Sequence, residues 1–152
     1  MPIRPLHPDE LEAWLVMRER LWPDSPRGDL AEEQREIIAQ PERNGVLVAE
    51  LQGTLIGFVE VSLRDWAEGC ETRPVGYLEA WFVEPEHRRS GVGRHLVEAA
   101  ENWARERGCT EMGSDAEVWN ETSHAAHRAL GFGEVCRVVA YSKKIAGEIP
   151  SS

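Results

Sequence analysis

Two glycines and three arginines lie close together between residues 88 and 94. The stretch reads Arg88-Arg89-Ser90-Gly91-Val92-Gly93-Arg94 and follows an apolar run that ends at Val83. A glycine lets the backbone approach a ligand closely, because no Cβ intervenes. The first N–H groups of a helix have no partner inside that helix, and the helix dipole adds partial positive charge there. The stretch therefore predicts an anion site for a phosphate or pyrophosphate.

Two familiar phosphate-binding loops do not match this stretch. A P-loop needs lysine and then serine or threonine after its second glycine, and this chain has neither there. A dinucleotide-binding loop needs a third glycine where this chain has Leu96. The pattern that remains is Arg-x-x-Gly-x-Gly, from Arg88 to Gly93. The alternative interpretation is a plain helix start with flexible glycines and solvated arginines.

The loop needs a strand before it and a helix after it, and the sequence predicts both. Residues 76–83 are an apolar run that is typical of a buried strand. Residues 91–107 have the periodicity of an amphipathic helix, and Gly108 follows as the residue that ends it. Strand, glycine-containing loop and helix N-terminus are thus consecutive in the chain.

The remaining sequence predicts a mixed α/β domain. We expect further strands at residues 2–6, 46–51, 54–64 and 109–116, with a hairpin turn at Gln52-Gly53. Further helices are expected at residues 8–22, from Asp29 as a cap to about Gln40, and at 120–130. One or two strands should follow Phe132, with apolar positions at Val135, Val138, Val139 and Tyr141. This alternation favours a sheet with helices on both faces in a single domain over residues 1–145, with residues 146–152 as a flexible tail.

The charge of the chain narrows the choice of partners. The 152 residues carry 17 basic and 27 acidic side chains, a net charge of −10. Nucleic acid is an unsuitable partner, because its affinity comes from cation–phosphate contacts. A cationic small substrate fits the sign better, although an acidic balance also serves solubility.

Cysteine usage and hydropathy indicate a cytoplasmic protein. Cys70, Cys109 and Cys136 form no C-x-x-C pair, and an odd, sparse set favours free thiols in a reducing compartment. We find neither a signal peptide nor an apolar run long enough for a membrane span. His124 and His127 have metal-ligand spacing, but without a third ligand we expect no metal.

The loop pattern resembles the pyrophosphate loop of the GCN5-related N-acetyltransferases, [RQ]-x-x-G-x-[GA]. These enzymes carry a second motif, Asn-x-x-Ala-(x)3-Tyr-(x)3-Gly-Phe, and this chain has Asn120, Ser123, His127, Gly131 and Phe132 at that spacing. The resemblance implies a mixed, mostly antiparallel central sheet with helices on both faces. It also implies acetyl-CoA as cosubstrate.

A closer resemblance, to the branch of aminoglycoside 6'-N-acetyltransferases, covers nearly the whole chain. It rests on segments such as Leu21-Trp22-Pro23, Tyr77-Leu78-Glu79, Ser114-Asp115 and residues 127–132. It implies acetylation of antibiotics such as kanamycin and tobramycin, and a homodimer joined through C-terminal strands. Two positions depart from the pattern. His127 replaces the usual tyrosine that can protonate the departing thiolate, and Cys136 stands where an acidic residue is expected on the drug-facing side.

The resemblance assigns the cosubstrate to the strand, the glycine loop and the second motif. The backbone of the strand should bind the pantetheine as an added strand would, and a backbone N–H there could polarise the thioester carbonyl. Asn120 should bind the pantetheine arm. His127 could protonate the thiolate or complete a hydrogen-bond network in the core. The expected cosubstrate-binding residues are Trp81, Phe82, Val83, Arg88, Arg89, Ser90, Gly91, Val92, Gly93, Arg94 and Asn120.

For the acceptor, the resemblance implies two carboxylates and two aromatic walls. The amine arrives as an ammonium and must lose a proton before attack. Asp115 is expected to take it, directly or through water, and Glu79 to hold the substrate. The alternatives are an exposed strand charge for Glu79 and a cap or turn residue for Asp115. Trp22 and Trp66 could pack on sugar rings, or Trp22 could belong to the core. Cys136 completes the expected substrate-binding set.

Two other functions remain open from sequence. The first is an acetyltransferase of the same fold that acts on a protein N-terminus or a polyamine, which are also cations. The second is an acyl-CoA-binding regulatory module without turnover, although such a module would need no base like Glu79 or Asp115.

Overall fold

A five-stranded sheet forms the centre of the protein, whose computed structural model describes residues 2–147. The strands lie in chain order, β1-β2-β3-β4-β5. β1 to β4 pair in antiparallel fashion, and only β5 runs parallel to its neighbour β4. Their bounds are β1 Ile3–Pro5, β2 Asn44–Leu51, β3 Thr54–Arg64, β4 Val75–Val83 and β5 Met112–Ser114.

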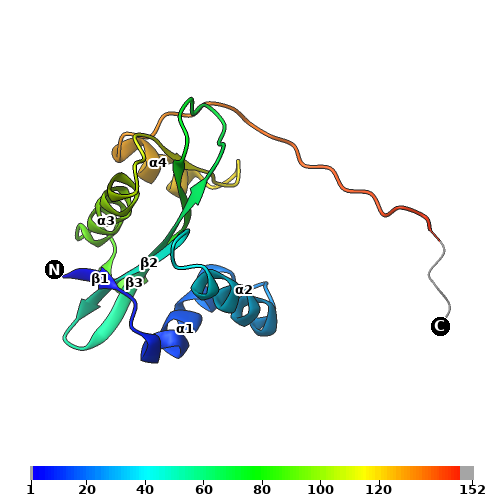
Figure 1. Ribbon diagram of the computed structural model, residues 1–152. Helices are drawn as coiled ribbons and strands as arrows, with labels where there is room; N and C mark the ends of the chain where they lie inside the picture. Colours follow the sequence, from blue (N-terminus) through cyan, green and yellow to red (C-terminus); the bar gives the residue numbers. More distant parts are fainter. Residues whose placement is uncertain (1, 148–152) are drawn as a thin grey trace.

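Helices cover both faces of this sheet, so the predicted α/β class is confirmed (Figure 1). α1 (Leu11–Leu21) and α2 (Arg27–Ala39) lie on one face. α3 (Val92–Glu106) and α4 (Glu121–Ala129) lie on the other. Two short 3-10 helices, Pro8–Glu10 and Pro85–His87, precede α1 and α3. No described helix is long and apolar enough to cross a membrane.

The hydrophobic core has two parts, because helices cover both faces of the sheet. Val59, Val61 and Leu96 belong to the cluster between the sheet and α3. Trp14 of α1 packs with Phe58 and Phe82 on the opposite face. Successive side chains of a strand point to opposite faces, so Phe58 and Val59 supply one core each. A strand buried on both faces reads as a continuous apolar run, which explains the composition of β3 and β4.

The predicted hairpin turn at Gln52-Gly53 is confirmed. Both residues have positive φ, 51° for Gln52 and 80° for Gly53. A two-residue hairpin turn with both φ values positive follows the natural twist of the strands. The turn therefore sets the pairing that brings Leu51 opposite Thr54.

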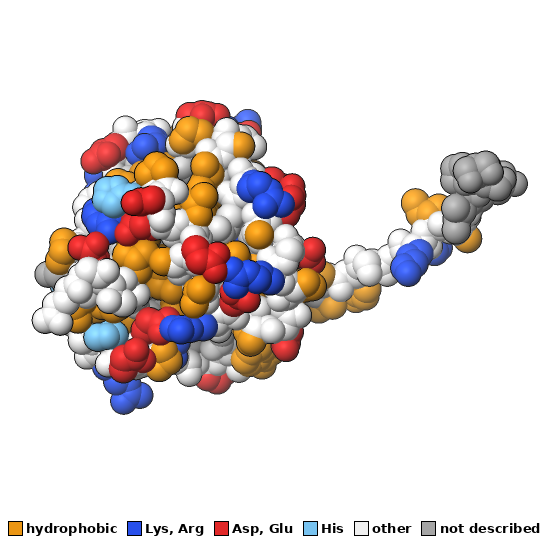
Figure 2. Space-filling view, turned by 90° about the horizontal axis from the view of Figure 1, so that it is seen from below, with side chains coloured by type: hydrophobic (Ala, Val, Ile, Leu, Met, Phe, Trp, Pro, Cys, Tyr) orange, Lys and Arg blue, Asp and Glu red, His pale blue; other side chains and the backbone are white. Residues whose placement is uncertain are grey.

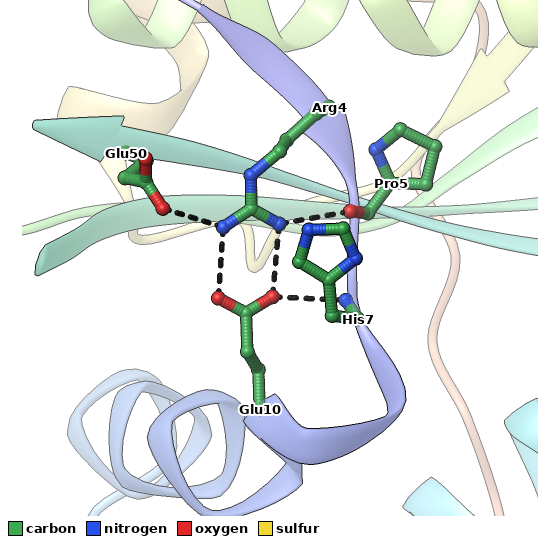
Figure 3. A network of polar contacts seen from close by, with 5 residues as sticks. All are labelled: Arg4, Pro5, His7, Glu10 and Glu50. Carbon is green, nitrogen blue, oxygen red and sulfur yellow. Dashed lines mark hydrogen bonds and ion pairs between the residues drawn. The ribbon is translucent and has the colours of Figure 1, made fainter. Parts of the chain in front are cut away.

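A polar network ties the edge strand β1 to the start of α1 and to β2 (Figure 3). Arg4 binds both carboxylate oxygens of Glu10, at 2.9 and 2.8 Å, and reaches Glu50 at 2.6 Å. Glu10 also accepts the backbone N–H of His7 at 2.8 Å. The bidentate bond from Arg4 lowers the pKa of Glu10 to about 2.

Two predicted features differ in the structure. α2 begins at Arg27, so Asp29 lies inside its first turn and is not its cap. The carbonyl of Pro26 accepts the N–H groups of Asp29 and Leu30 and starts the helix two residues early. The strands predicted after Phe132 were wrong, because no strand occurs in residues 133–147.

The C-terminal segment, residues 133–147, projects away from the body of the molecule (Figures 1 and 2). A strand needs a partner, and this segment leaves the sheet before it can pair. Val135 still lies against Gly69, where an added Cβ would be 2.6 Å from its Cγ1. Val138, Val139 and Tyr141 are exposed. Of the predicted tail, residues 148–152 lie outside the described residues.

Candidate active site

The glycine loop places an open helix N-terminus beside the end of β4. Gly91 caps α3 in the left-handed conformation, with φ of 90°, and Arg89 before it also has positive φ, 63°. Within the described residues, no hydrogen bond reaches the N–H groups of Val92, Gly93 and Arg94. A Cβ added at Gly91 would meet only the His95 ring, at 4.0 Å. The loop therefore offers three free donors and room for an anion.

The side chains of the loop hold its shape and leave cationic groups at its rim. Arg88 donates from Nε to the carbonyl of Val83 at 2.7 Å. Ser90 donates its hydroxyl to the carbonyl of His87. Arg94 reaches the carbonyl of Ala129 at the end of α4, at 3.2 Å. Arg89 is exposed and has no ion pair among the described residues. These arginines can add charge to the backbone donors of the loop.

The end of β4 packs tightly under the loop. Trp81 lies against Gly93, where an added Cβ would be 3.2 Å from the indole. Phe82 is buried against Phe58, with ring centroids 6.0 Å apart. Because both side chains are used in packing, only backbone groups of this strand are suited to bind a ligand. The structure thus brings the expected cosubstrate-binding segment of β4 next to the loop.

Glu79 lies at a β-bulge in β4. Glu60 of β3 pairs with Ala80 and Val61 pairs with Leu78, which leaves Glu79 as the extra residue. A bulge turns a side chain away from the regular alternation and often lies beside an active site. Arg64 binds both carboxylate oxygens of Glu79, at 2.7 and 3.0 Å, and Ser62 donates at 2.5 Å. Glu79 is therefore a held carboxylate, one-third exposed.

Asp115 follows β5 directly and is joined to Glu79 through two other side chains. The Tyr77 hydroxyl donates to the Asp115 carboxylate at 2.6 Å. The guanidinium carbon of Arg64 lies 3.5 Å from the centre of the Tyr77 ring. Burial, followed by the bond to Asp115, raises the pKa of the Tyr77 phenol. The phenol therefore remains a neutral donor at physiological pH.

A cleft of about 450 Å³ lies between Glu79 of the sheet and helices α1 and α2. Its lining includes Trp22 at the end of α1, Glu33 and Glu36 of α2, and Glu60 and Glu79 of the sheet. Trp22 is half-buried, and the Arg18 guanidinium lies 4.9 Å from its ring centre. The three exposed carboxylates, of Glu33, Glu36 and Glu79, and an aromatic wall suit a cationic, ring-containing ligand. A larger cleft of about 610 Å³ beside β1 contains none of the predicted site residues in its described lining.

Both ring nitrogens of His127 have protein partners. Nε2 lies 2.8 Å from the Ser114 hydroxyl, and Nδ1 lies 2.7 Å from the carbonyl of Ser123. A carbonyl can only accept, so Nδ1 donates to it, and Nε2 shares a hydrogen bond with the Ser114 hydroxyl. Trp81 and Phe132 contact the ring edge-on, with centroids at 5.8 and 5.3 Å. The ring thus joins α4 to β5 directly before Asp115.

Three other predicted residues lie outside the central constellation. Asn120 caps α4, and its side-chain oxygen accepts the N–H of Ser123 at 3.1 Å. Trp66 is exposed in the loop between β3 and β4. Cys136 is exposed in the C-terminal segment and is not brought to the cleft. All three cysteines are free thiols, as the sequence indicated.

Several site residues were missed from sequence. Glu60, Ser62 and Arg64 alternate with apolar residues along β3, and this period of two places them on one face. This alternation could have predicted from sequence that Glu60, Ser62 and Arg64 share one face of the sheet. No such pattern marks Tyr77, because its role depends on a partner from another strand. Among the described residues, no three His, Cys, Asp or Glu side chains form a group that could hold a metal.

Comparison with known proteins assigns a family to this architecture. Residues 14–132 match the model of the Acetyltransferase (GNAT) family. The chain is 43% identical to "Aminoglycoside N(6')-acetyltransferase type 1" of Klebsiella aerogenes over 150 residues, which are 94% of this chain and 96% of the relative.

Two solved structures are similar over almost their whole length. One is the apo aminoglycoside antibiotic 6'-N-acetyltransferase AAC(6')-IG from Acinetobacter haemolyticus, with 41% identity and a TM-score of 0.89, covering 95% of this chain and 99% of that one. The other is AAC(6')-Iy in complex with the bisubstrate analog CoA-S-monomethyl-acetylneamine. It has 36% identity and a TM-score of 0.88, and the match covers 95% of this chain and 98% of that one.

Proposed function

Because the chain belongs to the Acetyltransferase (GNAT) family, we propose that it transfers the acetyl group of acetyl-CoA to the 6'-amine of an aminoglycoside. The observation that carries the proposal is the identity of about 40% over nearly the whole chain with relatives of that name. The cleft that carries Glu33, Glu36 and Glu79 supports it, since an aminoglycoside is a cationic sugar.

The residues of the loop fit the pyrophosphate of acetyl-CoA. The free N–H groups of Val92, Gly93 and Arg94 supply donors, and Gly91 leaves the approach open. Arg88, Arg89 and Arg94 supply positive charge at the rim. The β4 backbone from Trp81 to Val83 would bind the pantetheine, and Asn120 at the start of α4 is the expected further partner. Acetyl-CoA supplies the reactive thioester when bound.

The two carboxylates divide the work on the acceptor. Asp115 accepts a proton from the substrate ammonium, directly or through water, so that the free amine can attack. Glu79 holds an ammonium group, because Arg64 and Ser62 keep its carboxylate in one place beside the cleft. Trp22 provides a face for a sugar ring. His127 bonds the Ser114 hydroxyl at Nε2 and the carbonyl of Ser123 at Nδ1, so these contacts favour its second expected role, a hydrogen-bond network in the core.

A substrate panel tests this proposal against its alternatives. Acetyl-CoA is combined with kanamycin, tobramycin, spermine or a peptide with a free N-terminus, and released thiol is measured. We expect turnover with the two aminoglycosides. Turnover only with spermine or the peptide would favour a different acceptor. Binding of coenzyme A without turnover on any acceptor would favour a regulatory module.

The C-terminal segment supports a homodimer. Residues 133–147 are extended and make no backbone–backbone hydrogen bond within the described part of the chain, and Val138 and Val139 are exposed. A second copy could pair with this backbone and cover these side chains. Cys136 would contact a substrate only if this pairing placed the C-terminal segment of one copy beside the cleft of the other. A chain that ends at Gly133 should be monomeric by light scattering, whereas a full-length monomer would contradict the dimer.

A further inference from the structure

The ring of Tyr77 is fixed so that only its hydroxyl reaches the end of β5. Tyr77 is 5% exposed and packs with Ala67 and Val75. It pairs with Gly113 on β5, where an added Cβ would lie 2.9 Å from the ring. Because Gly113 has no side chain, the ring can lie across β5 and bring its hydroxyl to Asp115 at 2.6 Å.

Arg64 fastens the other side of the same ring. Its guanidinium stacks on Tyr77 at 3.5 Å and bonds both oxygens of Glu79. A cation over an aromatic face is attracted to the ring, and it strengthens the phenol as a donor. One connected set, Ser62–Glu79–Arg64–Tyr77–Asp115, therefore fixes both carboxylates of the site.

We propose that Tyr77 is a positioning residue that holds the Asp115 carboxylate oriented for proton transfer. The phenol O–H donates to Asp115 Oδ2, and a hydrogen bond to a carboxylate is shorter and stronger than one between neutral groups, so it can fix the Asp115 side chain. This inference rests on the proposed function, in which Asp115 is the base. The charged and titratable groups that share this network with Asp115 are Tyr77 and Glu79 of β4 and Arg64 of β3, and His127 of α4 is bonded to the neighbouring Ser114.

Tyr77→Phe tests the proposal, since it removes the hydroxyl and keeps the ring. Loss of this bond to a charged group should lower kcat roughly tenfold while KM for kanamycin stays near wild type, because the proton acceptor is displaced and the hold on the substrate is not. Tyr141→Phe, at the 91% exposed second tyrosine, is the matched control and should change neither quantity.

A direct readout is the double-mutant cycle of Tyr77→Phe with Asp115→Asn on kcat. Tyr77→Phe should lower kcat in the wild-type background and have little further effect in Asp115→Asn, and Gly113→Ala, which displaces the ring but keeps the hydroxyl, should resemble Tyr77→Phe. An unchanged kcat in a folded Tyr77→Phe protein, or equal losses in both backgrounds, would overturn the proposal. If Asp115→Asn keeps wild-type kcat, the proposed role of Asp115 fails instead. If Asp115→Asn is impaired and Tyr77→Phe is not, only the positioning role fails.

Discussion

Arg18 and Glu60 form an ion pair beneath the cleft, with Nε 2.8 Å from Oε2 and side chains 3% and 5% exposed. Trp14 donates to the same oxygen at 3.0 Å, and Arg18 also bonds the carbonyl of Leu30 at 2.8 Å. Burial raises the pKa of Glu60, while Arg18 and Trp14 oppose that effect. The pair joins α1 to β3 and to the start of α2, so it supports the wall of the cleft that carries Trp22.

Removing one member of this pair should destabilise the protein strongly. Glu60→Ala leaves the buried Arg18 charge without its main partner, which costs about 3–5 kcal/mol of unfolding free energy. The control is Glu33→Ala, which removes a partner of Arg18 that is 54% exposed and should cost less than about 1 kcal/mol. Urea unfolding measures both. Equal losses of unfolding free energy in the two variants would contradict the claim that burial makes Glu60 the more important partner of Arg18.

The glycine loop should set cosubstrate affinity and leave the chemical step largely unaffected. Gly91→Val adds a Cβ where the backbone is left-handed, at a cost of about 1–2 kcal/mol, and obstructs approach to the helix N-terminus. The KM for acetyl-CoA and the Kd for coenzyme A should rise together. Gly28→Ala, in a helix with no atom within 4 Å of the added Cβ, is the control. An unchanged Kd for coenzyme A in folded Gly91→Val protein would show that this loop does not bind the cosubstrate.

Substitution of Asp115 and of Glu79 should change different kinetic constants. Asp115→Asn should lose on the order of a hundredfold in kcat and flatten its pH profile, because general-base help is worth about 10²–10⁴ in rate. Glu79→Gln should act chiefly on the KM for kanamycin, since it weakens the hold on an ammonium. The measurement is a pH series of both constants. A loss of kcat in Glu79→Gln with none in Asp115→Asn would reverse the roles.

Substrate binding should weaken with salt. Glu33, Glu36 and Glu79 line the cleft and are exposed, in a chain of net charge −10. The Debye length falls from ~10 Å at 0.1 M salt to ~3 Å at 1 M, which screens exposed charges. The KM for kanamycin should rise over this range, while the KM for a neutral acceptor analogue should not. A flat profile for kanamycin would argue against a cationic substrate.

Acid should remove the stability that Glu10 supplies. Its pKa is lowered from 4.5 to about 2 by Arg4, so the ionised form is favoured in the folded state. The contribution is fully present above the unfolded pKa of 4.5 and is lost as pH falls through about 2. Glu10→Gln should therefore be less stable than wild type at pH 7, and this difference should shrink as the pH falls towards 2. Glu42→Gln, at an exposed site with no ion pair among the described residues, should show no such trend. Chemical denaturation at several pH values measures the difference.

Local sequence was enough to predict the anion loop and most elements. The strand, the glycines and the helix N-terminus are consecutive, so their spacing alone places the free N–H groups beside β4. β3 occupies the predicted residues Thr54–Arg64, and Gly108 and Gly131 both have positive φ after a helix, as C-terminal glycines should. Such features depend on contacts within a few residues, which the chain order already contains.

Tertiary structure decided how the carboxylates are held and where the last residues go. Tyr77 and Asp115 are 38 residues apart, and Arg18 and Glu60 are 42 apart, so only the packed sheet brings each pair together. The bulge at Glu79 depends on the pairing of β3 with β4 and has no local signature. Residues 133–147 have the composition of strands but form none, because a strand exists only where a partner satisfies its backbone. Spacing along the chain thus determines what one element can bind, while the charge and orientation of the site depend on which distant groups packing places beside it.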